Sequence, residues 1–327
     1  MGVTLRLLAT GGTIASRLDA GGAVVPAVAA ADLVAATPGL AEYGPFEVEQ
    51  LDHVNGWNVT PAVMRQVAQR ARVALCDDRV DGVLVTHGTD TIEETAYLTD
   101  LLAGDATEAG PIVFACAMRN GSEVGADGPR NLLGAARVAR EPSARSRGAL
   151  LCANDEVHAA RWVTKTDTLA LQTFRSPEAG PVGHVDGERV RFTLGSPTRP
   201  ARGDDLVTDV ALVKIYTGMD DEVLRWHVDR GVRGLVVEGT GAGHVPGPVM
   251  PGLAYAAERG VPVVLTSRCW TGRTAAVYGG PGGGVTLDGL GVLRANGLSS
   301  PKARIALMVA LGISDDPVRL RAWFADA

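Results

Sequence analysis

One apolar segment that stops at a cluster of polar residues constrains this chain more than any other feature. Residues 83–86 (VLVT) have the composition of a buried strand, and residues 87–91 (HGTDT) separate them from an expected helix. Thr91 and Glu94 fit a capping box, in which side chains bond to free N–H groups of the first helical turn. Because ligands bind where strands end in an open α/β sheet, we expect Thr89 and Asp90 to border a site. The competing explanation is that the polar residues 89–91 only cap the helix. A single capping residue would be sufficient for that role.

The N-terminus repeats this arrangement. Residues 5–10 (LRLLAT) indicate a strand, and Gly11, Gly12 and Thr13 follow it. Two consecutive glycines let the backbone turn sharply and approach a ligand closely. We therefore expect two loops that carry threonines, each at a strand end, to meet at a switch point of one sheet.

Four segments resemble the signatures of the bacterial-type L-asparaginase family. The two longest are residues 9–15 (ATGGTIA) and 86–95 (THGTDTIEET), and the others are 125–132 (GADGPRNL) and 163–168 (VTKTDT). They occur in the family's order, and the chain resembles the family from end to end. The resemblance implies a two-domain α/β fold and hydrolysis of a small amide.

The pattern of elements predicts an α/β protein of two domains. A larger N-terminal domain (1–195) would hold a mixed, mostly parallel sheet flanked by helices, and its later strands, including a hairpin at Asp186-Gly187, would be antiparallel. Residues 196–208 have linker composition, and residues 209–327 would form a smaller parallel α/β domain.

The expected elements follow hydrophobic periodicity and turn signals. Residues 18–30 are rich in glycine and alanine, and we expect a mobile loop there, whereas Thr60-Pro61 indicates a helix start. The polar loop 119–129 is long enough to border the site. Strands are expected at 5–10, 46–51, 83–86, 111–118, 148–153, 157–164, 182–192, 210–216, 234–237 and 261–266, and helices at 31–36, 61–75, 92–104, 131–140, 222–230, 252–259, 300–311 and 317–324.

Bulk properties exclude several classes of protein. The 327 residues carry a formal net charge of -6, which gives no reason to expect binding to nucleic acid or to an anionic membrane. We find neither a signal peptide nor an apolar run long enough to span a bilayer. The four cysteines form no CxxC pair, which favours reduced thiols in the cytoplasm, and no cluster of His and Cys has zinc-ligand spacing.

Amide hydrolysis needs a nucleophile, a proton carrier and donors for the oxyanion. Thr13 and Thr89 are the candidate nucleophiles, and Lys165, between two threonines of a strand-like run, is the best candidate proton carrier. Burial would favour the neutral base form of Lys165, whereas a neighbouring Asp90 would favour the charged form. The residues therefore indicate a proton relay of Thr89, Lys165 and Asp90, with a merely solvated lysine as the alternative.

The resemblance implies a role for each of these residues. Thr13 matches the threonine that attacks the amide carbon, and Thr89, Lys165 and Asp90 match the family's triad, in which Asp90 also holds the substrate ammonium. Which threonine forms the acyl intermediate stays open, with Thr13 favoured. Backbone N–H groups of Gly88 and Thr89 are expected as oxyanion donors. Neither a metal nor an organic cofactor is implied.

Two departures from the family concern substrate binding. Residues 18–30 lack the tyrosine that family members carry there, and the loop 53–58 (HVNGWN) lacks the serine that holds the substrate. Asn55, Gly56 and Trp57 are the candidates in that loop, through backbone N–H groups or the Asn55 amide. The full predicted set of substrate-binding residues is Gly12, Asn55, Gly56, Trp57, Gly88, Thr89, Asp90 and His244.

His244 enters this set by resemblance alone. Residues 239–244 (GTGAGH) follow a strand but do not give GxGxxG in the position of a dinucleotide loop. In the family the corresponding loop supplies an asparagine to a neighbouring subunit, which implies a homodimer or homotetramer here. A surface histidine without a role is the alternative. His87, directly after its strand, is interpreted as orienting the loop by hydrogen bonding.

The sequence thus predicts a cytoplasmic amidohydrolase, an L-asparaginase that releases aspartate and ammonia. One alternative is an amidase of the same family that acts on glutamine, a D-amino acid amide or a modified asparagine. The other is a binding protein that kept the fold and lost turnover.

Overall fold

The computed structural model describes residues 4–195, 203 and 205–325, and it divides the chain into two compact units, Met1–Arg202 and Gly203–Ala327. Each unit is described by itself. Residues 196–202 and 204 of the expected linker lie outside the described residues.

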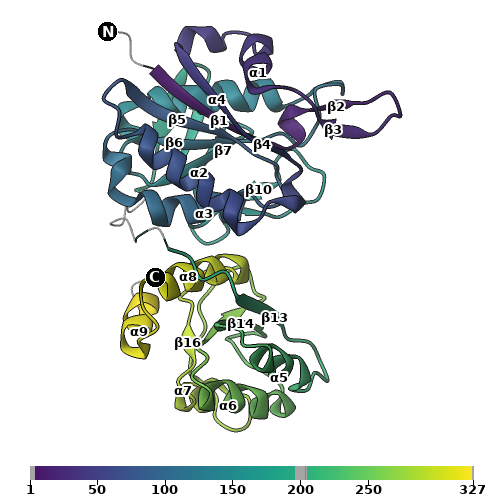
Figure 1. Ribbon diagram of the computed structural model, residues 1–327, viewed down its shortest axis with the longest axis vertical. Helices are drawn as coiled ribbons and strands as arrows, with labels where there is room; N and C mark the ends of the chain where they lie inside the picture. The colour runs from purple at the N-terminus through teal and green to yellow at the C-terminus, as the bar shows by residue number, and fades with distance from the viewer. Residues whose placement is uncertain (1–3, 196–202, 204, 326–327) are drawn as a thin grey trace. The chain divides into compact units, whose positions relative to one another are not determined.

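An eight-stranded sheet organises the first unit (Figure 1). Its strand order is β12-β11-β8-β7-β6-β5-β1-β4, and the strands from β7 to β4 are parallel, whereas β8, β11 and β12 extend the sheet in antiparallel pairs. The mixed, mostly parallel sheet is confirmed, including the hairpin at Asp186-Gly187. The strands are β1 (Thr4–Gly11), β4 (Phe46–Val54), β5 (Val80–Thr86), β6 (Ile112–Ala115), β7 (Ala149–Ala153), β8 (Glu156–Ala159), β11 (Gly183–Asp186) and β12 (Arg189–Phe192).

Helices cover both faces of this sheet (Figure 1). The helices α1 (Ala30–Ala36) and α4 (Gly128–Arg140) pack on one face, and α2 (Pro61–Ala74) and α3 (Ile92–Ala103) pack on the other. Leu7 and Leu8 of β1 accordingly belong to opposite cores and are both fully buried. Because the central strands are buried on both faces, they are continuous apolar runs that end only where the sheet meets solvent.

Short elements complete the first unit. The expected mobile loop at 18–30 is instead a small antiparallel hairpin of β2 (Ser16–Leu18) and β3 (Val24–Pro26), held by ladder bonds that the weak hydrophobic pattern did not reveal. A second short pair joins β9 (Thr164–Lys165) to β10 (Phe174–Arg175). Single 3₁₀ turns occur at η1 (Thr13–Ala15), η2 (Leu40–Tyr43), η3 (Gly56–Asn58), η4 (Gly104–Glu108) and η5 (Pro142–Ala144).

The second unit is a four-stranded parallel sheet in the order β13-β14-β15-β16. Its strands are β13 (Val210–Lys214), β14 (Gly234–Gly239), β15 (Val263–Ser267) and β16 (Leu293–Arg294), and its helices are α5 (Glu222–Asp229), α6 (Met250–Glu258), α7 (Gly284–Gly289), α8 (Ser300–Ile313) and α9 (Pro317–Ala325), with η6 at Gly247–Val249. The sequence did not predict β16 and α7, because both are too short to show a period.

No helix among the described residues is long and apolar enough to cross a membrane.

Candidate active site

Three adjacent strands of the first sheet end at the same edge. The central strand β1 pairs with β5 up to Ala9 and Thr86, and with β4 up to Gly11 and Val54. We call residues 11–15 the first threonine loop, residues 87–91 the second threonine loop and residues 55–58 the third loop. All three leave the carboxyl edge of the sheet, where an open α/β sheet places its ligand site.

Glycines bring the three loops into backbone contact. A Cβ atom on Gly12 would lie 2.4 Å from the Cα and N atoms of Gly88, and one on Gly88 would lie 2.6 Å from Cα of Gly56. No real side chain tolerates such distances, so the loops can approach this closely only without Cβ atoms. Thr13 and Thr89 each follow one of these glycines and therefore lie on touching loops.

Thr91 fastens the second threonine loop to the third loop. Its hydroxyl donates to the Gly56 carbonyl at 2.7 Å, and it makes no capping bond to the first turn of α3. The expected capping box at Thr91 is therefore wrong. The hydroxyl serves a long-range contact, because the carbonyl of a buried residue needs a donor.

Lys165 contacts both Thr89 and Asp90. Its ammonium donates to Oγ1 of Thr89 at 2.9 Å and lies 2.8 Å from Oδ1 of Asp90. The Thr89 side chain is buried, and the Lys165 side chain is 17 % exposed, whereas that of Asp90 is 42 % exposed. The backbone N–H of Lys165 donates to Oε2 of Glu93 at 2.8 Å, which fixes β9 against the start of α3. The Lys165 ammonium thus joins a hydroxyl and a carboxylate through two hydrogen bonds.

His87 fixes the orientation of the peptide group between Gly88 and Thr89. The ring is fully buried, and burial lowers the pKa of His87 from 6.5 to about 4, so it is neutral at pH 7. Nδ1 lies 2.8 Å from the Gly88 carbonyl, and Nε2 lies 2.9 Å from the Thr95 hydroxyl.

This geometry assigns the tautomer of His87. A carbonyl oxygen only accepts, so Nδ1 carries the proton and Nε2 accepts from Thr95. The Gly88 carbonyl is turned toward the ring, and in a trans peptide the next N–H points the opposite way. The N–H of Thr89 therefore points away from His87. The interpretation of His87 as a residue that orients the loop agrees with these bonds.

Thr13 begins the turn η1 and is half-buried. The turn is fixed from both ends, since the Gly12 N–H donates to the Val54 carbonyl at 3.0 Å and the Ser16 hydroxyl donates to the Gly12 carbonyl at 2.8 Å. Within the described part of the chain, the Thr13 hydroxyl makes no hydrogen bond. It is thus a positioned hydroxyl without a partner, on a loop that touches the Lys165 network through Gly12 and Gly88.

The remaining predicted residues are not joined to this network by side-chain contacts within the described ranges. Trp57 is 66 % exposed, and the Asn55 carbonyl accepts from the N–H of Asn58 at 2.9 Å. His244 lies in the second unit, where its ring packs edge-on against Tyr278 and its Nδ1 atom is buried without a hydrogen-bond partner among the described residues. No group of three or more His, Cys, Asp or Glu side chains in residues 4–195, 203 and 205–325 gathers as metal ligands would.

Sequence reasoning missed Glu93 and Thr95 as parts of this arrangement. Both lie in α3, and the only sequence feature that could have indicated them is that they are polar residues on a helix that starts at the site. Sequence spacing alone does not show that Glu93, rather than its neighbour Glu94, contacts β9.

Comparison with known proteins covers both units. The family model "Asparaginase, N-terminal" matches residues 4–197, and "Glutaminase/Asparaginase C-terminal domain" matches residues 209–324. L-asparaginase 2 of Bacillus subtilis is 32% identical over 330 residues, covering 98% of this chain and 85% of that protein. A glutamyl-tRNA(Gln) amidotransferase subunit of Methanobrevibacter smithii is 30% identical over 324 residues, covering 95% of this chain and 73% of that protein.

The fold is also similar to a solved structure. The crystal structure of a probable cytoplasmic L-asparaginase from Campylobacter jejuni has a TM-score of 0.86 and 28% sequence identity, and the match covers 99% of each chain.

Proposed function

The chain belongs to the asparaginase family of hydrolases, and on that premise we propose that it hydrolyses the side-chain amide of L-asparagine to L-aspartate and ammonia through a threonine nucleophile. One observation carries the proposal. The Lys165 ammonium lies within hydrogen-bond distance of both Thr89 and Asp90, beside the loop that presents the unpartnered Thr13 hydroxyl. Nucleophile, proton carrier and charge partner are thus available at one sheet edge.

In the proposed reaction the Thr13 oxygen attacks the amide carbon. Its proton passes to the departing nitrogen, which leaves as ammonia, and an ester between Thr13 and the aspartyl group remains. Water then attacks the ester, Thr89 and Lys165 relay the water's proton, and the Thr13 oxygen recovers its hydrogen as aspartate leaves. Thr13 is favoured over Thr89 as the nucleophile, because the Thr89 oxygen already accepts from Lys165.

The negative charge that develops on the amide oxygen needs N–H donors. The N–H of Thr89 is suited to this task, since the bond between His87 and the Gly88 carbonyl turns that N–H away from the ring. A donor whose direction is fixed before the reaction needs no rearrangement in the transition state, which is the main source of this kind of stabilisation.

The two charges of a free amino acid also need partners, because an unpaired buried charge is strongly destabilising. Asp90 is the proposed partner of the substrate ammonium, since its carboxylate is half-exposed beside Lys165. Backbone N–H groups of Gly56, Trp57 and Gly88 are proposed to hold the carboxylate, with the Asn55 amide as an additional donor. Fewer side-chain contacts should weaken ground-state binding rather than the chemistry.

A related amidase that acts on glutamine or another small amide is the second candidate. The similarity to the glutamyl-tRNA(Gln) amidotransferase subunit supports it, because that relative aligns over nearly the whole of this chain. A binding protein without turnover is the third candidate, and the contacts of Lys165 argue against it.

An ammonia-release assay separates these candidates. L-asparagine, L-glutamine and their D-isomers are supplied to the wild type and to Thr13→Ala, and aspartate is measured beside ammonia. We expect release from L-asparagine that Thr13→Ala lowers by at least about a hundredfold. Preferred release from glutamine would favour the second candidate, and tight asparagine binding without ammonia would overturn the proposal.

The proposed working unit is a cytoplasmic homodimer or homotetramer. By its resemblance to the family, the loop that ends at His244 would reach a partner's site, and the unpaired Nδ1 atom of His244 supports a role beyond its own unit. Sedimentation and activity are measured at matching protein concentrations, and a fully active monomer would refute this assembly.

A further inference from the structure

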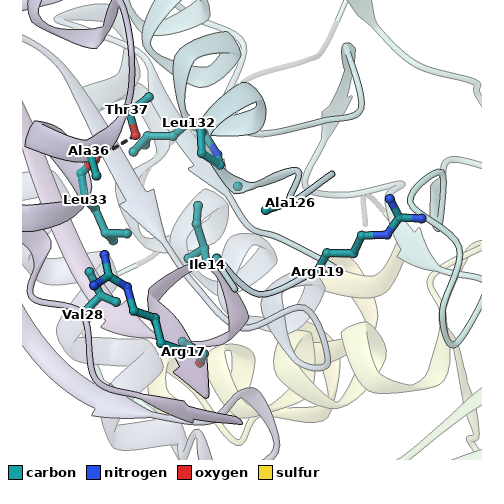
Figure 2. A pocket seen from close by; sticks show the side chains of 13 residues that line it. Ile14, Arg17, Val28, Leu33, Ala36, Thr37, Arg119, Ala126 and Leu132 are labelled. Atoms are coloured by element: carbon teal, nitrogen blue, oxygen red, sulfur yellow. Dashed lines mark hydrogen bonds between the residues drawn. The ribbon is translucent and has the colours of Figure 1, made fainter. Parts of the chain in front are cut away.

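A cavity of about 160 Å³ lies beside the first threonine loop (Figure 2). Its walls come from the strand β2, from α1 and α4, and from the loop at 119–127. Its apolar lining includes Ile14, Val28, Leu33 and Leu132, all of which are buried. A cavity of this size has room for a group such as a benzene ring.

The hydroxyl groups that line the cavity are already used within the fold. The Ser16 hydroxyl donates to the Gly12 carbonyl at 2.8 Å, and the Thr37 hydroxyl donates to the Leu33 carbonyl at 2.8 Å, the bond that Figure 2 draws as a dashed line. Neither is available as a donor for a polar ligand. The buried apolar side chains of the lining therefore favour a ligand with an apolar body.

Two arginines supply the formal charges in the lining. Arg17 is an exposed residue, and in the view of Figure 2 its guanidinium lies toward Val28 and Leu33, whereas the Arg119 guanidinium points away from them. Arg119 donates to the Gly125 carbonyl at 3.4 Å, and no carboxylate in the described part of the chain pairs with Arg17.

The two acidic side chains of the neighbouring loop, Glu123 and Asp127, do not neutralise Arg17. The Glu123 carboxylate accepts from the N–H of Asn120 at 3.1 Å. The carboxylate of Asp127 accepts from the N–H groups of Met118 and Arg119, at 2.8 to 3.1 Å, and so serves the loop itself. Among the described residues, the cavity thus combines several apolar side chains with two arginines that pair with no carboxylate, and of these two only the Arg17 side chain makes no hydrogen bond.

We propose that this cavity binds a small monocarboxylate whose apolar body is about the size of a benzene ring. The body fills the space over Ile14 and Leu33, and the carboxylate pairs with the planar guanidinium of Arg17, which can donate two parallel hydrogen bonds. The site is separate from the proposed substrate site, since Thr13, Thr89, Asp90 and Lys165 do not line the cavity.

The test is a ¹⁹F NMR titration of 4-fluorobenzoate against the full chain. We expect saturable binding at one site per chain, and a neutral analogue, 4-fluorobenzyl alcohol, should bind at least about tenfold more weakly. Saturating L-aspartate should leave the binding unchanged, because the product belongs at the substrate site. The titration needs no turnover, so its result is independent of the ammonia-release assay.

Two variants locate the site within the molecule. Arg17→Gln should raise the dissociation constant about tenfold, since a hydrogen bond to a charged group is lost. Ala126→Phe places a ring into the cavity and should abolish binding. Arg189→Gln, an exposed arginine on β12 at the far end of the sheet from β1, is the matched control and should bind as the wild type does.

The proposal is overturned if the wild type shows no saturable binding, if L-aspartate displaces the probe, or if binding survives unchanged in both Arg17→Gln and Ala126→Phe. Thermal unfolding of each variant beside the wild type verifies that the fold is retained.

Discussion

Two loops with similar sequences leave parallel strands in the two units, and their contacts differ. The first threonine loop follows β1 and contains Gly12 and Thr13, and the His244 loop (residues 239–244) follows β14 and contains Thr240. In the His244 loop the N–H and the hydroxyl of Thr240 both donate to the His244 carbonyl, at 2.9 and 3.2 Å, so the threonine closes its own loop. Within the described residues, the Thr13 hydroxyl is left without such a bond.

The difference shows that a glycine-threonine loop at a strand end does not by itself assemble the groups of the proposed site. The first threonine loop meets a second strand-end loop whose hydroxyl and carboxylate contact the Lys165 ammonium. The His244 loop has a lysine in its unit as well, but Lys214 pairs with Glu238 at 2.8 Å and is 70 % exposed. The first threonine loop and the His244 loop therefore differ in the side chains that other segments bring next to them, rather than in their own sequences.

Replacing the two lysines should give the largest contrast. Lys165→Met removes the proposed proton carrier next to Thr89, and we expect the rate of ammonia release to fall about a thousandfold. Lys214→Met removes the exposed lysine of an ion pair in the second unit and should change the rate less than about twofold. Steady-state kinetics on L-asparagine measures both, and equal losses would remove the distinction between the two regions.

The buried histidine of the site should make the stability of the first unit depend on pH. The unfolded chain protonates His87 near pH 6.5, and the folded chain does so only near pH 4, because the ring is buried. The unfolded state binds more protons between these values, so His87 stabilises the fold above about pH 6.5, and that contribution, about 3 kcal/mol, is lost as the pH falls toward 4.

His87→Asn tests this pH dependence, since the Asn amide can replace the Nδ1 donor but does not titrate. The free energy of unfolding, measured by urea titration between pH 4 and 7, should vary less in this variant than in the wild type. His158, whose pKa burial also lowers to about 4, should retain part of the slope. An unchanged slope in His87→Asn would show that His87 is not the titrating group.

A methyl group at a loop contact should separate the two regions again. Gly88→Ala places Cβ 2.6 Å from the backbone of Gly56, so the loops must move apart, and displacement of about 1 Å at a site costs about a hundredfold in rate. In Gly241→Ala the new Cβ meets nothing closer than 3.9 Å, and we expect a loss of less than about tenfold. If Gly241→Ala lowers the rate more than Gly88→Ala does, the contact between Gly88 and Gly56 does not position the site.

The smallest expected effect concerns the third loop. Asn55→Ala should raise KM for L-asparagine about fivefold and leave kcat unchanged, since the proposed hydrogen bond from its amide to the bound substrate would be lost. Asn58→Ala, in the same loop, is the matched control and should behave as the wild type. An unchanged KM in Asn55→Ala would mean that its side chain is not a ligand.

Long periodic segments of the fold were predictable from sequence. The runs that became β1 and β5 are apolar because both of their faces are buried, and Thr60 followed by Pro61 starts α2 as its residue types indicate, with the Thr60 hydroxyl accepting from Val63 N–H at 3.4 Å. These features depend on local conformational preference and on burial, which act through neighbouring residues. Short elements such as the β2–β3 hairpin and β16 carry too few residues for either signal.

The sequence by itself determined where the chain places threonines and glycines after buried strands. Only the tertiary structure decided which groups each of them meets. The sequence around Thr91 predicted a capping side chain, but in the structure the Thr91 hydroxyl lies 2.7 Å from the Gly56 carbonyl. Lys165 lies in a two-residue strand, and its side chain contacts Asp90 and Thr89, which are 75 and 76 residues away in the sequence. A hydroxyl or an ammonium bonds to whatever donor or acceptor the fold brings within about 3 Å, and that choice is set by the packing of distant segments rather than by sequence spacing.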